Sequence, residues 1–497
     1  MTAKVAQVLI VGRDAAAWLT ALALQRAFGR TGVTVRVVEL PSLLGPADVY
    51  AAVPSLAGLH ALLGLKEHEV LAAASGIPVL GQRFSNWSGP AKPFVHGYDT
   101  QRVAIDDLDF LQFWVKARGE GLKIGLDDFS LAASAARQGR APVERDGTQV
   151  ETPVAPGYHF DALAYVAMVR RAALAAGVEG RAAGVCGVNR TGDRIDSVIL
   201  DDGMTVPADL FIDASGAEAV LARDNPAAAF ESWRDLFRAD RILVASAPPL
   251  RRLPGHSEIA AFSAGWLGLF PLQDRTAITA VYDSSLMSDR DMAAAIPVLS
   301  GLPAAGDMTV EPFTPGLHPA WSGNCIAIGG AAVVLEPLDA VHLHLIHTGL
   351  SHLIALFPLD AAHMPEAAVF NAGFASHVRN IRDFQLTHYA LNRRYDEPFW
   401  DRARDMPVPE RLAERLRLFE ARGAVAIYDD ESFQEQNWTA VFVGHGLIPR
   451  SYTPLVDRIP AQEQMAKFQG LLARVAEEVR AMPDIDSQFG QRAEPNR

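Results

Sequence analysis

The hydrophobic pattern near the start of the chain predicts a strand, a helix and a second strand. Residues Val5–Val11 form an apolar run, as expected of a parallel strand that is covered on both faces. Apolar positions at helical spacing follow over Ala15–Phe28, and Gly29 is a helix stop signal. The next apolar run, Val33–Val38, closes on Glu39. A right-handed crossover would make the two strands parallel neighbours.

Further strand and turn signals are scattered along most of the chain. Tyr158–Val178 has the pattern of an amphipathic helix, and Asp193–Gly216 predicts two short strands followed by a third apolar run. Gly323–Leu338 predicts a strand, a glycine turn and a possible helix start. This scatter favours one interleaved architecture over separate consecutive domains. From about Met406 the pattern is mostly helical, and residues 491–497 are expected to form a frayed tail.

Composition limits the classes to which this chain can belong. Its 497 residues are 49% hydrophobic and 21% charged, which is ordinary for folded globular proteins. The formal net charge of −13 argues against nucleic acid or an anionic membrane as a partner. The two cysteines, Cys186 and Cys325, lie far apart in the sequence, so they fit a reducing compartment better than a disulfide framework or a zinc site.

No segment of the sequence has the pattern of a targeting or membrane-spanning element. The N-terminal apolar run is short and ends in Arg13-Asp14, unlike a secretory signal. No stretch approaches the ~18 uninterrupted apolar residues that a membrane helix needs. We therefore expect a cytoplasmic protein with no membrane partner.

The first strand-to-helix turn has the frame of a dinucleotide-binding loop, G-x-G-x-x-G, with only one of its glycines. It reads GRDAAA over residues 12–17. Gly12 keeps the tight turn, and Ala17 is a tolerated packing substitute. Asp14 puts a carboxylate where the backbone should approach phosphate at a helix N-terminus. Either Arg13 offsets that charge, or Asp14 turns away and caps the helix.

Two acidic residues end predicted strands near this turn. Glu39 lies where an acidic residue would bind a ribose hydroxyl, and Asp213 ends the third apolar run. The alternative is a turn that holds no ligand, because strand ends commonly carry Asp. The loop alone does not decide between a cofactor site and plain strand-to-helix packing.

Seven segments, in order along nearly the whole chain, carry more specific patterns. They read IVGRDAAAW, which ends in Trp18; YHFDA; ADLFIDASG; GWLGLFPL; GNCIAIGGAAVVLEPLD; RDFQLTHYALNRRYDEPFW; and NWTAVFVGHGLIPRSYTPL. Together they resemble the motifs of the flavin-dependent tryptophan halogenases, a branch of the flavoprotein-monooxygenase fold. Each segment alone would be weak evidence; their shared order makes the resemblance strong.

The resemblance implies an α/β fold. An FAD-binding domain of the glutathione-reductase or flavoprotein-monooxygenase type would be interleaved with a mostly helical substrate domain. We expect the FAD-binding domain over residues 1–400, with inserted substrate-binding segments at about 80–150 and 220–320. A mainly helical region over 401–497 would pack on the substrate side. The resemblance also suggests a homodimer.

The resemblance further implies bound FAD that a separate flavin reductase reduces, and a small aromatic or peptide substrate. In such a family, oxygen and halide react at the flavin to give hypohalous acid, which travels through a tunnel to a lysine beside the substrate. The cofactor contacts expected here are Gly12, Arg13, Asp14, Ala17, Trp18, Glu39, Asp213, Gly329, Gly330 and Ala331.

The positions expected to carry catalysis depart from the family pattern. Counting back from Trp87, the family's lysine falls on Val79, which carries no proton; Lys92 lies outside the frame. The segment that supplies the family's glutamate and halide contacts reads PLDAVH, in which Asp339 keeps a shorter carboxylate and His342 adds bulk. His96 aligns with a substrate-pocket histidine, although loop packing is an equal alternative.

Two more segments differ from the family pattern. The second Trp of the GWLGLFPL motif is replaced by Gly268, and the loop expected over the flavin reads VYAA at residues 49–52. Within HLHLIHTGLSH, only His344 and His347 have a spacing that suits a metal site. Because no acidic third ligand is nearby, polar packing or a ligand pocket explains them better and no metal is expected.

Three functions remain open on the sequence. The first is a divergent flavoenzyme of this family that binds FAD and oxidises or oxygenates an organic substrate. The second is a true halogenase of an indole-type substrate with a rearranged site. The third is a non-catalytic binding protein on an inherited scaffold, which would neither hold nor turn over flavin.

Overall fold

A computed structural model describes residues 4–89, 92–99, 103–142, 154–223 and 229–490. The chain divides into two compact units, each assembled from three separate stretches of sequence. Unit 1 comprises Met1–Gly76, Phe160–Arg234 and Pro312–Asn380, whereas unit 2 comprises Ile77–His159, Asp235–Glu311 and Ile381–Arg497. The predicted interleaving is therefore present, whereas the finer domain bounds remain predictions. The expected frayed tail, 491–497, lies outside the described residues.

Unit 1 is built on a six-stranded sheet whose apolar strands are covered on both faces. The strand order is β10 (Glu179–Ala182), β2 (Thr34–Glu39), β1 (Gln7–Gly12), β14 (Leu210–Ala214), β23 (Cys325–Ala327) and β22 (Trp321–Ser322). The first five strands are parallel and β22 is antiparallel to β23. The predicted β1–helix–β2 unit is confirmed, with Gly12 opposite both Glu39 and Ala214.

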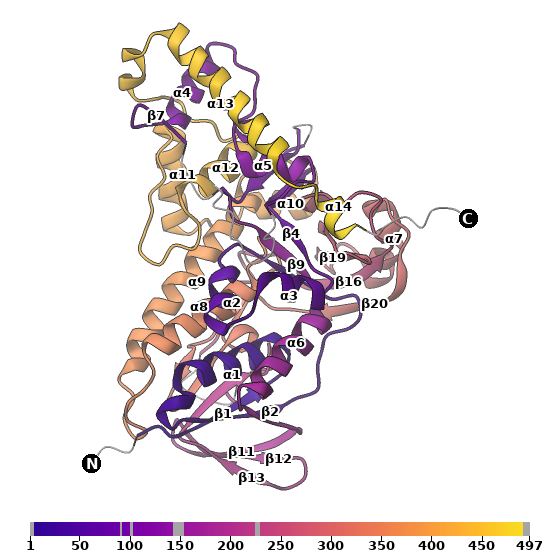
Figure 1. The fold of residues 1–497 in the computed structure, drawn as a ribbon, viewed down its shortest axis with the longest axis vertical. Coiled ribbons are helices and arrows are strands. Elements are labelled where there is room, and N and C mark those ends of the chain that lie inside the picture. Colours follow the sequence, from indigo (N-terminus) through magenta and orange to yellow (C-terminus); the bar gives the residue numbers. More distant parts are fainter. Residues whose placement is uncertain (1–3, 90–91, 100–102, 143–153, 224–228, 491–497) are drawn as a thin grey trace. The chain divides into compact units, whose positions relative to one another are not determined.

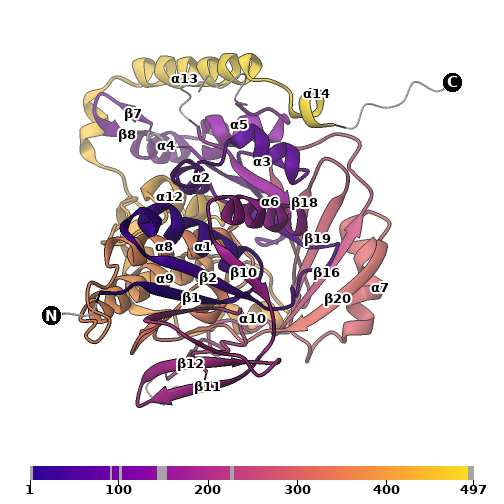
Figure 2. The same cartoon turned by 60° about the horizontal axis from the view of Figure 1, so that its bottom comes forward.

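Different elements cover the two faces of this sheet. Helices α1 (Asp14–Phe28), α6 (Ala162–Ala175) and α8 (His342–Ala355) lie on one side, and the antiparallel strands β11 (Val185–Thr191), β12 (Arg194–Leu200) and β13 (Thr205–Pro207) lie on the other (Figures 1 and 2). Leu9, Val11 and Phe211 of the large sheet share a buried cluster with Ile195 and Val198 of the small one. The alternating apolar side chains of β1 therefore serve both faces.

Unit 1 also contains several short elements. They are β3 (Val49–Ala52), α2 (Leu56–Leu63), α3 (Glu67–Ala73), a small sheet of β15 (Glu231–Ser232), β21 (Gly316–Leu317) and β24 (Val333–Val334), and most of α9 (Glu366–Ala390).

Two predicted helix bounds are wrong. The segment Tyr158–Val178 begins with a strand, β9 (Gly157–Asp161), and becomes helical only at Ala162. The Asp161 carboxylate accepts the Ala164 N–H at 2.8 Å and so starts α6. After the glycine turn near residue 330 the chain forms β24 in place of the expected helix, and α8 begins at His342.

Unit 2 contains a seven-stranded sheet that the hydrophobic pattern did not predict. Its order is β20 (Ala305–Pro312), β16 (Arg241–Ala247), β19 (Thr276–Tyr282), β18 (Gly265–Pro271), β17 (Ser257–Phe262), β5 (Gly81–Ser85) and β6 (Phe94–Gly97). Strands β16 to β17 are antiparallel, and β17 runs parallel to β5. The strand β4 (Ile77–Val79) pairs separately with β9.

Helices make up the rest of unit 2. They are α4 (Phe110–Gly119), α5 (Leu131–Arg137), α7 (Asp289–Ser300), α10 (Pro398–Arg404), α11 (Glu410–Arg422), α12 (Glu435–Gly444), α13 (Ala461–Ala481) and α14 (Ile485–Phe489). The last four confirm the predicted helical pattern beyond Met406. Over the described ranges, no helix is both long and apolar enough to cross a membrane.

One buried side chain joins the two sheets of unit 1. Asn324, 1% exposed, lies in the turn before β23. Its amide oxygen accepts the Ile195 N–H at 2.8 Å, and its amide nitrogen donates to the carbonyls of Ile195 at 2.9 Å and Asp209 at 3.2 Å. Three backbone groups therefore depend on this one side chain.

We predict that Asn324→Ala lowers the free energy of unfolding by roughly 2–4 kcal/mol, because buried backbone groups lose their partners. Asn189→Ala is the matched control: Asn189 lies in β11 and is exposed, and its side-chain amide donates to the Ser197 hydroxyl at 2.9 Å. Its effect should stay within about 0.5 kcal/mol. Urea denaturation of both variants checks this, and equal losses of stability would contradict it.

Candidate functional site

The carboxyl ends of β1, β14 and β23 bring three turns of unit 1 into close contact. A Cβ atom at Gly12 would lie 2.5 Å from the carbonyl oxygen of Ala214, so no larger residue fits there. A Cβ at Gly330 would lie 3.1 Å from the Cα of Gly216, and Gly329 has φ +64°. Ligands of α/β sheets bind at this end of parallel strands. The predicted contacts Gly12, Gly329 and Gly330 are thus close-packed parts of one strand-end surface.

Asp14 is the first residue of α1 and adopts a left-handed backbone conformation, with φ 56°. Its carboxylate does not cap the helix; it accepts the Ser42 hydroxyl at 2.6 Å and the Leu43 N–H. Burial raises the pKa of Asp14, and the nearby Arg13 guanidinium opposes that rise. Arg13 itself hydrogen-bonds to Glu218 at 2.8 Å. The carboxylate therefore fastens the loop after β2 to the start of α1.

Tyr50, in the segment VYAA expected over the flavin, is a neighbour of this helix start. Its hydroxyl oxygen accepts the N–H of Ala15, and both burial and the Asp14 carboxylate raise the pKa of Tyr50. The Tyr50 ring stacks on His342, with centroids 5.4 Å apart and planes at 11°. The Tyr50 side chain of β3 thus reaches a backbone N–H at the start of α1, and His342 of α8 packs against it.

Glu39 makes three interactions with neighbouring side chains. Arg170 donates to both of its oxygens, at 2.9 and 3.0 Å, and the Trp18 indole N–H donates at 3.1 Å. The Arg170 guanidinium also lies over the Trp18 ring, 5.1 Å from its centroid. Arg170, on α6, carried no sequence signal because it is distant in the chain. A ribose contact of Glu39 remains a prediction.

Asp213 is fully buried and shapes the turn that follows β14. Its oxygens accept the Ser215 hydroxyl at 2.5 Å and the backbone N–H groups of Leu221 at 2.6 Å and Ala222 at 2.9 Å. Burial raises the pKa of Asp213, and these donors oppose the rise. A direct cofactor contact of Asp213 stays a prediction, as it does for Ala17 and Ala331, which are both buried.

Asp339 and Ala340, just before α8, both have left-handed backbone conformations, with φ 58° and 56°. Asp339 is 2% exposed. Non-glycine residues seldom adopt this conformation, and such strain concentrates at functional sites. In the same helix, His344 Nδ1 lies 2.8 Å from the Ser55 hydroxyl oxygen. Among the described residues, no group of three His, Cys, Asp or Glu side chains could hold a metal ion.

The two remaining predicted positions lie in unit 2. Val79 ends β4, opposite Gly157, and its side chain is 1% exposed. His96, in β6, is also 1% exposed; its Nε2 accepts the Asn437 amide N–H at 3.2 Å, and its ring packs 5.5 Å from Phe384. These contacts fit packing within an aromatic cluster, and a role of His96 in a substrate pocket remains a prediction.

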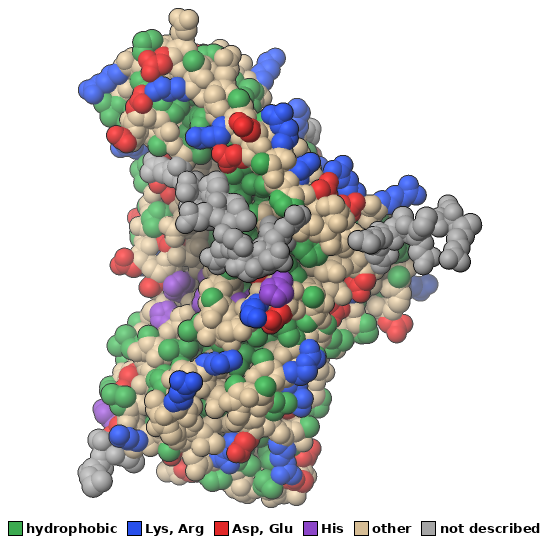
Figure 3. All heavy atoms as spheres, viewed as in Figure 1, with side chains coloured by type: hydrophobic (Ala, Val, Ile, Leu, Met, Phe, Trp, Pro, Cys, Tyr) green, Lys and Arg blue, Asp and Glu red, His purple; other side chains and the backbone are tan. Residues whose placement is uncertain are grey.

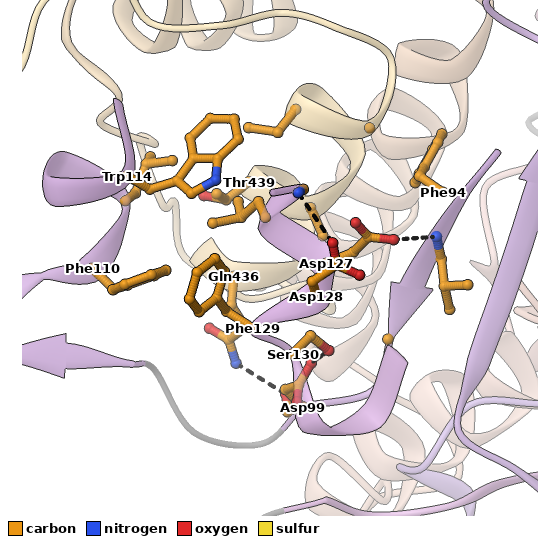
Figure 4. A pocket seen from close by; sticks show the side chains of 18 of the residues that line it. Phe94, Asp99, Phe110, Trp114, Asp127, Asp128, Phe129, Ser130, Gln436 and Thr439 are labelled. Carbon is orange, nitrogen blue, oxygen red and sulfur yellow. Dashed lines mark hydrogen bonds between the residues drawn. The ribbon is translucent and has the colours of Figure 1, made fainter. Parts of the chain in front are cut away.

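A large cavity lies next to His96 within unit 2. Its volume is about 740 Å³, and its walls come from β6, α4, α12 and the segment 123–130. Phe110, Trp114 and Phe129 form an aromatic wall, and Ser130, with Asp99, forms part of a polar one (Figure 4). This volume suits an organic ligand of drug-like size. The sequence could not reveal the cavity, because its walls come from segments far apart in the chain.

The comparisons with known proteins agree over nearly the whole chain. A family model described as "Tryptophan halogenase" matches residues 7–461. The chain is 26% identical over 480 residues to Tryptophan 6-halogenase SttH of Streptomyces toxytricini, covering 90% of this chain and 88% of that protein. The structure of BrvH, a flavin-dependent halogenase from Brevundimonas sp. BAL3, matches at 31% identity and TM-score 0.90, covering 97% and 98% of the two chains. Xcc4156, a flavin-dependent halogenase from Xanthomonas campestris, matches at 28% identity and TM-score 0.91, covering 99% and 100%.

The buried histidine His159, in the strand that pairs with β4, predicts that the stability of the protein depends on pH. His159 pairs with Ile77 of β4; its Nδ1 lies 3.0 Å from the Pro271 carbonyl oxygen and its Nε2 lies 2.8 Å from the Ser257 hydroxyl. Burial lowers the pKa of His159 to about 4. Because the unfolded chain takes up the proton near pH 6.5, stability is lost as the pH falls from about 6.5 toward 4.

We predict that His159→Gln reduces the slope of the unfolding free energy against pH by up to about 1.4 kcal/mol per pH unit. Glutamine can form similar hydrogen bonds, but it does not titrate. Urea denaturation between pH 7 and 5 measures the slope. His68→Gln is the control, because His68 is a surface residue with 57% side-chain exposure. An unchanged slope in His159→Gln would contradict the assignment of a buried neutral histidine.

Proposed function

Because the chain belongs to the tryptophan halogenase family, we propose that unit 1 binds FAD, which a separate flavin reductase reduces. We propose further that the protein oxidises or oxygenates an organic substrate without lysine-assisted halogenation. The observation that carries this proposal is the side chain at position 79. A buried valine, 1% exposed, has no proton with which to polarise hypohalous acid, whereas a lysine does.

The strand-end surface of unit 1 supports the FAD part of the proposal. The close contacts at Gly12 and Gly330 exclude side chains at these two positions, so backbone atoms form the strand-end surface there. The Asp14 carboxylate is the unfavourable group, and its oxygens are bound by the Ser42 hydroxyl and the Leu43 N–H. We assign Arg13 and the first backbone N–H groups of α1 to the phosphates, and Glu39 to the ribose.

FAD, when bound and reduced, supplies the electron pair and protons that reduce dioxygen, so that one oxygen atom enters the substrate and the other leaves as water. The chain contributes binding and the exclusion of water. The family motif GWLGLFPL keeps Trp266, whose indole N–H donates to the Tyr389 hydroxyl at 3.0 Å. The second Trp of the motif is replaced by Gly268. A motif that screens the substrate from the flavin would therefore do so with a smaller side chain in this protein.

One observation favours a second candidate, a non-catalytic binding protein. The Tyr50 hydroxyl accepts the Ala15 N–H, one of the donors that a phosphate would use. Tyr50 thus supplies the protein's own acceptor at the start of α1, and the Asp14 carboxylate adds a negative charge beside it. A flavin titration separates the two candidates, because the non-catalytic protein would hold neither oxidised nor reduced FAD.

We predict that FAD binds the wild-type protein saturably and that Asp14→Gly binds it about twofold to fivefold more tightly. The variant removes a carboxylate at a helix N-terminus, an effect of about 0.3–1 kcal/mol, and glycine accepts φ 56° without strain. Asp106→Gly is the matched control, because Asp106 has φ 47° but lies in unit 2. Quenching of flavin fluorescence measures the affinities. No binding to folded wild-type protein would overturn the FAD proposal.

We predict that Val79→Lys yields no halogenated product from indole with a flavin reductase, NADH, oxygen and bromide. The segment at Asp339–His342 lacks the hydroxyl and glycine of the family's halide contacts, so the lysine alone is insufficient. Val79→Met, similar in length but uncharged, controls for packing. Mass spectrometry distinguishes a brominated product from one that has gained an oxygen atom. Bromination by the wild type would overturn the proposed chemistry, and bromination by Val79→Lys alone would contradict the assigned role of the halide segment.

A further inference from the structure

The acidic side chains of the unit 2 cavity already have partners within the protein. Arg137 donates to Asp127 Oδ2 at 2.6 Å and to Asp128 Oδ1 at 2.9 Å. The second oxygen of Asp128 accepts the Gly125 N–H at 3.1 Å. In Figure 4 the Asp127 and Asp128 carboxylates lie beside each other on the cavity wall. One guanidinium therefore holds both side chains in place.

The other acids of the cavity serve the starts of helices. Asp109 is the N-cap of α4 and accepts the Leu111 N–H at 2.7 Å. Asp99 accepts the Ser130 hydroxyl and, at 3.0 Å, the Ala132 N–H at the start of α5. Glu435 lies in the first turn of α12. Helix N-termini stabilise carboxylates, so Asp99 and Asp109 are held by backbone N–H groups at the starts of α5 and α4.

Four basic side chains of the same cavity differ in this respect. Lys92, Arg118, Lys123 and Arg393 line it and are exposed, so they form its mouth. Within the described ranges, none of the four makes an ion pair; Arg118 lies 5.2 Å from the centroid of the Trp114 ring, and Arg393 donates to a backbone carbonyl. On the face of the molecule shown in Figure 3, acidic and basic side chains are interspersed. A set of four unpaired cations is thus a local feature of a chain whose net charge is −13.

One wall of the cavity is aromatic. The ring centroids of Phe110 and Phe129 are 4.7 Å apart, and Trp114 lies on the same wall (Figure 4). The Trp114 indole N–H donates to the Ile124 carbonyl at 3.1 Å, so its polar atom is satisfied. A ligand would therefore meet ring surfaces inside and positive charge at the mouth. The volume of about 740 Å³ exceeds the need of a single small ring.

From this arrangement, we propose that the cavity binds an amphipathic organic anion, with its aromatic or apolar body against Phe110, Trp114 and Phe129 and its acidic group at Lys92 and Lys123. As the substrate class of the enzyme, this inference rests on the proposed function; as a binding site, it stands on the cavity alone. Cations that surround a concave mouth raise the local concentration and the association rate of an anion. The same charges disfavour an amine of equal size.

Two fluorescent probes with the same body and opposite charge test the proposal. Pyrenebutyrate and pyrenebutylammonium are titrated against the full-length protein at low and moderate salt, and fluorescence anisotropy is measured. We expect the anion to bind at least about tenfold more tightly than the cation, with the difference shrinking as salt screens the mouth. Equal affinities, or tighter binding of the cation, would overturn the proposal.

Matched variants locate the binding site. Lys92→Gln combined with Lys123→Gln should weaken pyrenebutyrate binding by roughly fivefold to tenfold, since two exposed charges are removed from the mouth. Lys4→Gln combined with Lys66→Gln removes the same charge from exposed positions of unit 1 and should leave binding unchanged. Thr439→Phe fills the cavity from α12 and should weaken both probes. Equal effects of the two lysine pairs would overturn the proposal.

Flavin titration of the same samples separates this inference from the proposed function. If the anion binds as expected and FAD does not, the cavity is a binding site and the flavoenzyme proposal is wrong. If FAD binds and the anion shows no preference over the cation, the proposed substrate class is wrong and the flavoenzyme proposal stands.

Discussion

The contact on which unit 1 depends most is the close approach of β1 and β14 at Gly12. A Cβ at this position would lie 2.5 Å from the Ala214 carbonyl oxygen, which itself accepts the Arg13 N–H at 3.1 Å. Only a glycine allows the strands to stay parallel up to the point where α1 begins. Because Gly330 approaches Gly216 in the same manner, the strand ends form a backbone surface, and the chemistry proposed for this unit requires that surface.

Polar side chains around the strand ends mainly hold neighbouring loops and turns in place. Asp213 holds the turn after β14, Asp14 fastens the loop after β2, and Glu39 is bound by Arg170. A carboxylate that is buried without partners would be costly, so each satisfies donors of its own protein. The same bonds place Tyr50 and Asp14 at the start of α1. The proposed site is thus a modified dinucleotide loop in which protein side chains compete with a phosphate.

Membership of the halogenase family determines the scaffold and leaves the reaction open. The chain matches the family model over residues 7–461, yet Val79 is apolar and buried. A reaction that needs a proton donor at that position would lack one. A flavoenzyme that transfers oxygen directly does not need it, and the aromatic cavity of unit 2 offers a separate place for selecting a ligand by its charge.

The sequence by itself determined the family, the β1–α1–β2 unit, the strands around Asp193–Gly216 and the helical region beyond Met406, because local periodicity and ordered motifs encode them. It misplaced the start of α6, where the short segment Tyr158–Asp161 suits a helix or a strand equally. The tertiary structure alone decided that this run pairs with β4, that Arg170 binds Glu39 and that Tyr50 meets Ala15. It alone also formed the seven-stranded sheet and the cavity of unit 2. These features join residues far apart in the chain. A local sequence pattern does not indicate which distant residue will bond to a given polar group or pack against a given apolar one.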